Sequence, residues 1–124
     1  MKVKKVRIGL KSAKEALDDF VNAGEAAARG ETVKVEKGVY FESLAGFRKA
    51  LTPKRLELLH LIREKHPKSL QELSRISGRN MKNVVGDIGL LVSLGLVEIH
   101  RTKGGLRKSV PQVSYARINL EIAV

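Results

Sequence analysis

The chain of 124 residues has the length of one domain, or of a small domain with an extension, and its 43% hydrophobic residues suffice for one modest core. Cysteine is missing, which excludes disulfides and thiolate metal sites, and no apolar run approaches the roughly 20 residues of a membrane span. The net charge of +11 favours an anionic partner, with nucleic acid as the first candidate. The basic N-terminus has no apolar stretch of the secretory type, so we expect a cytoplasmic protein.

The positive charge is concentrated in the middle of the chain. Residues 52–110 hold twelve Lys and Arg against five Asp and Glu, whereas residues 1–51 hold eleven against seven. An anion-binding surface is therefore expected mainly within residues 52–110.

The first part of the chain predicts a β-α-β extension over residues 1–42. Basic and apolar residues mix over 2–10 and predict a short strand, and alternating valines predict another over 32–42. Between them Ser12 is a candidate N-cap of a helix that ends near Ala28. The apolar stripe of that helix consists of Ala13, Ala16, Leu17, Phe20, Val21 and Ala27. Since two short strands seldom stand alone, they should complete a sheet with a partner subunit or with a later hairpin.

Three helices are predicted next, after a short helical segment over residues 43–50. The first runs over 53–65, with Thr52 as its cap and an inward face of Leu56, Leu59 and Ile62.

The other two helices, over residues 69–94, are joined by a tight turn. Ser69 and Glu72 have the spacing of a capping box, and Gly78 can supply the left-handed conformation that ends the first of the two. Asn80 can cap the second, and Gly95 ends it. Two short helices separated by a glycine form a helix-turn-helix pattern.

A hairpin and a final strand complete the chain. Strands on either side of Gly104-Gly105 predict the hairpin called the wing, and Pro111 is expected to interrupt its returning strand. Residues 115–124 alternate as a strand that could pair with the N-terminal strand or across a dimer interface. The predicted fold is therefore α+β: a winged helix-turn-helix over residues 43–124 with the extension over residues 1–42.

Three motifs carry a resemblance to known regulators. LTPKRLELL (51–59), GRNMKNV (78–84) and LGLV (94–97) resemble a family of small DNA-binding proteins of archaea and bacteria, within the broader MarR-like winged helix-turn-helix regulators. The resemblance implies a homodimer. Some members of that family are encoded beside a toxin gene, which implies antitoxin function as an alternative.

The candidate DNA-binding residues follow from the second helix of the motif, whose N-terminal end enters the major groove. The residues expected at base edges are Arg79, Asn80, Met81, Lys82 and Asn83. Those expected at phosphates are Lys54, Arg55, Ser69, Arg101, Lys103, Arg107 and Lys108.

Some of these assignments have structural alternatives. Asn80 could act only as a helix cap, and Asp87 could either pair with a neighbouring basic residue or be simply exposed. Gly86 and Gly89 are unusual inside such a helix, since each weakens it by about 1 kcal/mol relative to Ala. Either the helix approaches something closely there, or recognition is weaker than the motif suggests.

The functional hypothesis is a transcriptional regulator that binds double-stranded DNA sequence-specifically as a homodimer. An antitoxin that binds a cognate toxin and represses its own operon is the second hypothesis, and an RNA-binding protein the third. The three histidines lack the spacing and carboxylate companions of a zinc site, and no nucleophile or phosphate-loop motif is present. We therefore expect no enzyme activity, no metal, no cofactor and no membrane partner.

Overall fold

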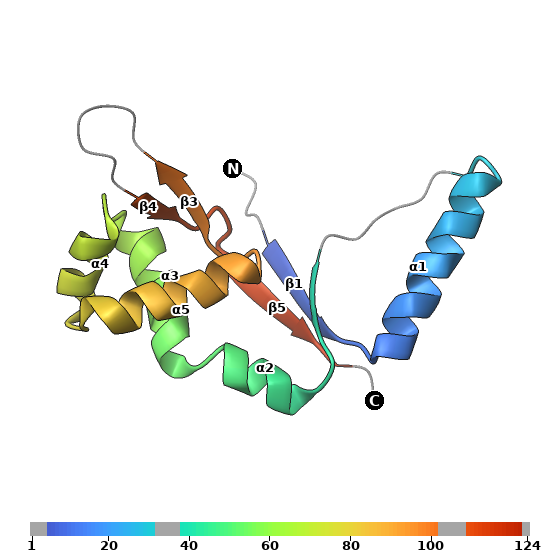
Figure 1. The fold of residues 1–124 in the computed structure, drawn as a ribbon, viewed down its shortest axis with the longest axis horizontal. Coiled ribbons are helices and arrows are strands. Elements are labelled where there is room, and N and C mark those ends of the chain that lie inside the picture. Colours follow the sequence, from blue (N-terminus) through green and yellow to red (C-terminus); the bar gives the residue numbers. More distant parts are fainter. Residues whose placement is uncertain (1–4, 32–37, 102–108, 123–124) are drawn as a thin grey trace. The chain divides into compact units, whose positions relative to one another are not determined.

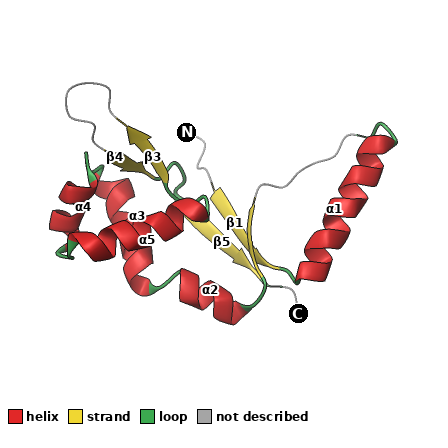
Figure 2. Cartoon of the chain, in the orientation of Figure 1, coloured by secondary structure: helices red, strands yellow, loops and turns green. Residues whose placement is uncertain are grey.

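The computed structural model describes residues 5–31, 38–101 and 109–122 (Figures 1 and 2). No helix in these ranges is both long and apolar enough to cross a bilayer. The elements in chain order are β1 (Lys5–Leu10), α1 (Ala13–Ala28), β2 (Gly38–Phe41), α2 (Leu44–Ala50), α3 (Pro53–Lys65), α4 (Leu70–Ser77), α5 (Met81–Ser93), β3 (Glu98–Arg101), β4 (Ser109–Gln112) and β5 (Arg117–Glu121).

These elements form two compact units. One comprises residues 50–116, and the other comprises residues 5–49 together with β5. The grouping differs from the division at residues 42 and 43 predicted from the sequence, because α2 and β5 join the first part of the chain.

The unit of residues 5–49 is built on a parallel sheet with the strand order β2-β1-β5. Ile8 of β1 pairs with Val39 on one side and with Leu120 on the other, and its side chain is fully buried. The parallel pairing of β1 and β2 across α1 confirms the predicted β-α-β arrangement. Of the partners that the sequence left open, β5 completes this sheet rather than the wing.

Helix α1 has the predicted apolar stripe, but the stripe is not covered. Ser12 caps the helix by accepting the N–H of Glu15 at 3.2 Å. Leu17, Phe20 and Val21 are all exposed, Phe20 to 76%. The amphipathic pattern therefore forms a helix whose apolar side chains find no cover among the described residues of the unit.

The other unit is a winged helix-turn-helix: α3, α4 and α5 followed by the antiparallel hairpin β3–β4. All three caps predicted here are present. The side chains of Thr52, Ser69 and Asn80 accept the backbone N–H three residues further on, at 3.3, 3.0 and 3.0 Å. Gly78 adopts φ 67° after α4, and the N–H of Arg79 returns to the carbonyl of Ser74, which fixes the turn between the two helices.

The core of the winged helix is aliphatic. It consists of Leu51, Leu58, Leu59, Ile62, Leu73, Val84, Ile88, Leu91, Leu96 and Val97. One predicted inward residue is wrong, since Leu56 is exposed and Leu58 occupies the core instead. Leu58, Leu59 and Ile62 form an i, i+1, i+4 set, which lies on a helical face just as well as the predicted spacing.

The hairpin also differs from the prediction at Pro111. This residue lies inside β4, buried and opposite Ile99, and does not interrupt the strand. Proline is compatible with a strand that has an unpaired edge, because its missing N–H is not needed there.

The loop after α5 is held by a buried hydrogen bond. Gly95 adopts φ 77°, and the N–H of Leu96 donates to the carbonyl of Leu91 at 2.9 Å, which closes the helix. The hydroxyl of Tyr115 donates to the carbonyl of Leu96 at 2.8 Å, and burial raises the pKa of Tyr115 to about 12. The tyrosine thus ties the chain that follows β4 to the end of α5.

Replacing Tyr115 with phenylalanine should lower the free energy of unfolding by about 1–2 kcal/mol, because the Leu96 carbonyl loses its buried donor. Since the pKa of Tyr115 is higher in the folded than in the unfolded chain, its contribution is complete below pH 10 and is lost as the pH rises toward 12. Urea unfolding at pH 7 and pH 11 checks both points: the variant should lose less stability than the parent between these pH values. An equal loss would contradict the assigned role.

Candidate nucleic-acid interface

Helix α5 presents its N-terminal end to solvent. Val84, Ile88 and Leu91 anchor one face of the helix in the core. Met81, Lys82 and Asn83 are exposed in its first turn, as the helix-turn-helix pattern predicts for residues that meet base edges. The side-chain oxygen of Asn80 is used as the helix cap, at 3.0 Å from the N–H of Asn83. The predicted role of Asn80 as the cap of α5 is therefore confirmed.

Asp87 of α5 connects this helix to α3 and to the turn that precedes α5. Its carboxylate accepts Nε of Arg55, from the start of α3, at 3.0 Å, and Nη2 of Arg79, from the turn before α5, at 2.6 Å. Side-chain exposure is 16% for Asp87, 22% for Arg55 and 18% for Arg79. Burial alone would raise the pKa of Asp87, but the hydrogen bonds from Arg79 and Arg55 outweigh it and lower this pKa below the usual 3.8.

This network uses two residues that the sequence assigned to DNA. Arg55 also donates from Nη1 to the carbonyl of Ala50 at 2.9 Å. Arg79 is held at Nη2, while its Nη1 is buried and has no hydrogen-bond partner among the residues that the structure describes. The interpretation of Asp87 as a partner of neighbouring basic residues is confirmed, and both arginines serve the packing of α5 against the rest of the winged helix.

The other predicted contact residues fall into three groups. Lys54 in the first turn of α3 and Arg101 at the end of β3 are exposed, as a phosphate contact requires. Ser69 caps α4 with its hydroxyl. The wing residues Lys103, Arg107 and Lys108 lie outside the described residues.

An apolar part of the α5 surface was not among the predicted contacts. Val85 is 47% exposed, and Gly86 and Gly89 lie beside it. A Cβ atom added at either glycine would meet nothing within 4 Å in the described part of the chain, so packing against those residues does not require glycine at these positions. The sequence offers one signal for this surface, because Val85 lies one helical turn after Met81, but periodicity alone does not say that the valine is exposed.

The segment that carries this surface matches a known family. The family model HVO_A0114 matches residues 50–120, more than half of the chain. The chain belongs to the HVO_A0114 family. The chain is also similar to a solution NMR structure of Mb0332 (fragment 1–100) from Mycobacterium bovis. That structure is described as a homodimeric winged helix-turn-helix DNA-binding domain of a possible ArsR-family transcriptional regulator. The sequence identity is 20% and the TM-score is 0.45, over 84% of this chain and 73% of that chain. No curated protein matches the sequence.

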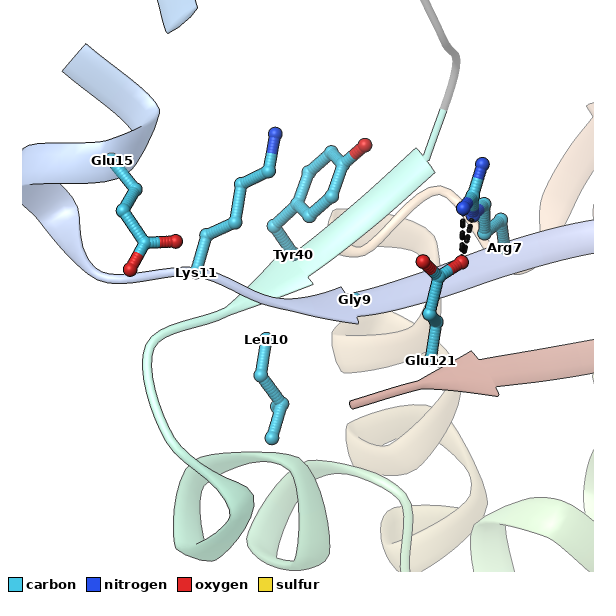
Figure 3. A pocket seen from close by; sticks show the side chains of 7 residues that line it. All are labelled: Arg7, Gly9, Leu10, Lys11, Glu15, Tyr40 and Glu121. Carbon is cyan, nitrogen blue, oxygen red and sulfur yellow. Dashed lines mark hydrogen bonds and ion pairs between the residues drawn. The ribbon is translucent and has the colours of Figure 1, made fainter. Parts of the chain in front are cut away.

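Most of the other unit lies outside the residues that match the HVO_A0114 family, and it contains a polar pocket of about 230 Å³ (Figure 3). Nε of Arg7 donates to Glu121 at 2.7 Å across one wall, and Nζ of Lys11 lies 4.3 Å from the ring centre of Tyr40 at the other. A Cβ at Gly9 would come within 2.9 Å of Tyr40, so glycine lets the ring lie across β1. The described residues hold no cluster of three metal-ligating side chains, here or elsewhere.

Proposed function

We propose that this chain is a transcriptional regulator that binds double-stranded DNA sequence-specifically, with the first turn of α5 in the major groove. The observation that carries the proposal is the exposure of Met81, Lys82 and Asn83 at the N-terminal end of a helix fixed by the winged-helix core. The excess of positive charge over residues 52–110 supports an anionic partner for the same segment. The resemblance to MarR-like regulators also agrees with it, and such a protein would act in the cytoplasm.

In this proposal, base contacts and phosphate contacts come from different elements. Lys82 and Asn83 would read base edges, whereas Lys54 and Arg101 would contact phosphates, joined by the wing residues Lys103, Arg107 and Lys108. Asp87 would act indirectly, by holding α5 against α3 through the two arginines.

The experiment is a selection of duplex fragments from the source genome, followed by titration at several salt concentrations. We expect a recurring sequence among the bound fragments and an affinity that falls steeply with salt, because the basic residues release counterions from the phosphates. Bound fragments without any common sequence, or a higher affinity for RNA in competition, would contradict the proposal.

We further propose that the protein is a homodimer formed through α1. Its exposed apolar stripe has large residues in the first half, Leu17 and Phe20, and small ones in the second, Gly24 and Ala27. In an antiparallel pair of α1 helices, Phe20 of one copy would lie opposite Gly24 of the other and Leu17 opposite Ala27, so that large side chains fill the space above small ones. Antiparallel helix dipoles also attract each other.

Replacing Phe20 with glutamate should convert the dimer to a monomer, because a charge would be buried in the helix pair. Sedimentation equilibrium measures this, with Asn22→Glu on the opposite side of α1 as the matched control that should remain dimeric. A dimeric Phe20→Glu variant would contradict the α1 interface. If instead the parent is monomeric and binds the protein encoded by a neighbouring gene through Phe20, the antitoxin hypothesis replaces the homodimer.

A further inference from the structure

We propose that α5 recognises the C5-methyl groups of thymines, through the exposed side chains of Met81 and Val85. This inference rests on the proposed function, since it concerns the same helix and the same groove. It assigns the protein a preference for A·T base pairs at the positions that face these two residues.

The two apolar side chains share one side of the helix. Met81 and Val85 are four residues apart, so they lie one above the other, and they are 38% and 47% exposed. Exposed apolar side chains on a surface that meets DNA need an apolar partner, and the thymine methyl is the apolar group that the major-groove edges of the base pairs offer.

The cations available on α5 favour the same conclusion. Guanine is commonly read by an arginine or a lysine, but α5 carries a single basic residue, Lys82. Arg79, just before the helix, is 18% exposed and directs Nη2 to Asp87 at 2.6 Å. Asn83, in contrast, has the amide side chain that pairs with adenine, the partner of thymine.

The two glycines of α5 let the apolar side chains reach the bases. Gly86 follows Val85 directly and Gly89 lies one turn further on, and among the described residues nothing lies within 4 Å of a Cβ atom added at either glycine. A helix surface without side chains can approach the groove more closely than one with them. Packing against the described residues does not require these two glycines. A close approach of α5 to the duplex at Val85 would explain them.

The test uses a short duplex recovered from the genomic selection and the same duplex with deoxyuridine in place of thymidine, which removes only the methyl groups. We expect the affinity to fall about three- to fivefold for each contacted methyl, the value of one buried methyl-sized group. Val85→Ala and Met81→Ala should weaken binding of the thymidine duplex and leave binding of the deoxyuridine duplex nearly unchanged. Val92→Ala is the matched control: Val92 is similarly exposed but lies two turns beyond Val85, so it should bind both duplexes like the parent.

The outcomes separate this inference from the proposed function. If no duplex is selected, the proposed function fails. If a duplex is bound specifically but its deoxyuridine form binds equally well, the methyl contact is overturned while the DNA-binding function stands. A methyl-dependent loss in Val92→Ala as large as that in Val85→Ala would overturn the assignment to the first turns of α5.

Discussion

Replacing Asp87 with asparagine should lower the free energy of unfolding of the winged helix by about 2–3 kcal/mol, the value of charge-assisted hydrogen bonds at a largely buried site. The carboxylate is the acceptor that Arg55 and Arg79 share, at 3.0 and 2.6 Å. Asparagine keeps the shape but removes the negative charge between two guanidinium groups. Thermal and urea unfolding measure the loss.

The pH dependence of the free energy of unfolding tests the role of Asp87 a second time. Because the pKa of Asp87 is lowered below 3.8 in the folded chain, the ionised network stabilises the fold above about pH 4 and loses this effect as the pH falls through the folded pKa. The difference between the parent and Asp87→Asn should therefore shrink in acid. Asp18→Asn, at an exposed position of α1, is the control and should change stability little. Asp87→Asn with unchanged stability at pH 7 would show that the network contributes nothing.

Replacing Lys82 and Asn83 together with alanine should lower the affinity for the selected duplex by about 30-fold or more, since two good base contacts at about 1–3 kcal/mol each contribute at least about 2 kcal/mol of discrimination. Affinity for unrelated duplexes should change little. The fold should persist, because both side chains are exposed and the N–H of Asn83 that bonds to Asn80 belongs to the backbone. Fluorescence anisotropy with selected and scrambled duplexes measures both affinities.

A comparison with the wing separates base reading from phosphate contact. Replacing Arg107 and Lys108 with alanine should weaken binding to selected and scrambled duplexes alike and reduce the salt slope by about two. If both double variants bind the selected duplex like the parent, the assignment of α5 to the groove is wrong.

The features that the sequence predicts correctly are local. Each of the caps Ser12, Thr52, Ser69 and Asn80 bonds to a backbone N–H three residues away, and this spacing can be read from neighbouring residue types alone. The hydrophobic periodicity of the two helices and Gly78 between them are also local features, and they suffice to predict the helix-turn-helix.

The features that the sequence leaves open or mispredicts depend on distant parts of the chain. Arg55 is 32 residues from Asp87, so its use inside the protein rather than on DNA follows only from the folded arrangement. The pairing of β5 with β1 joins residues more than 100 positions apart. Periodicity also identifies an apolar face without saying what covers it, which is why Phe20 and Val85 could not be recognised as exposed.

The most direct test of the central claim uses the lack of cysteine in the natural chain. Asn83→Cys, labelled with an iron chelate that cleaves nearby DNA, reports where the first turn of α5 lies on the selected duplex. The account predicts cuts within the selected site, with the offset between the two strands that is expected of a cleaving group in the major groove. An uncut duplex, bound by labelled Asn83→Cys as tightly as by the parent, would contradict it.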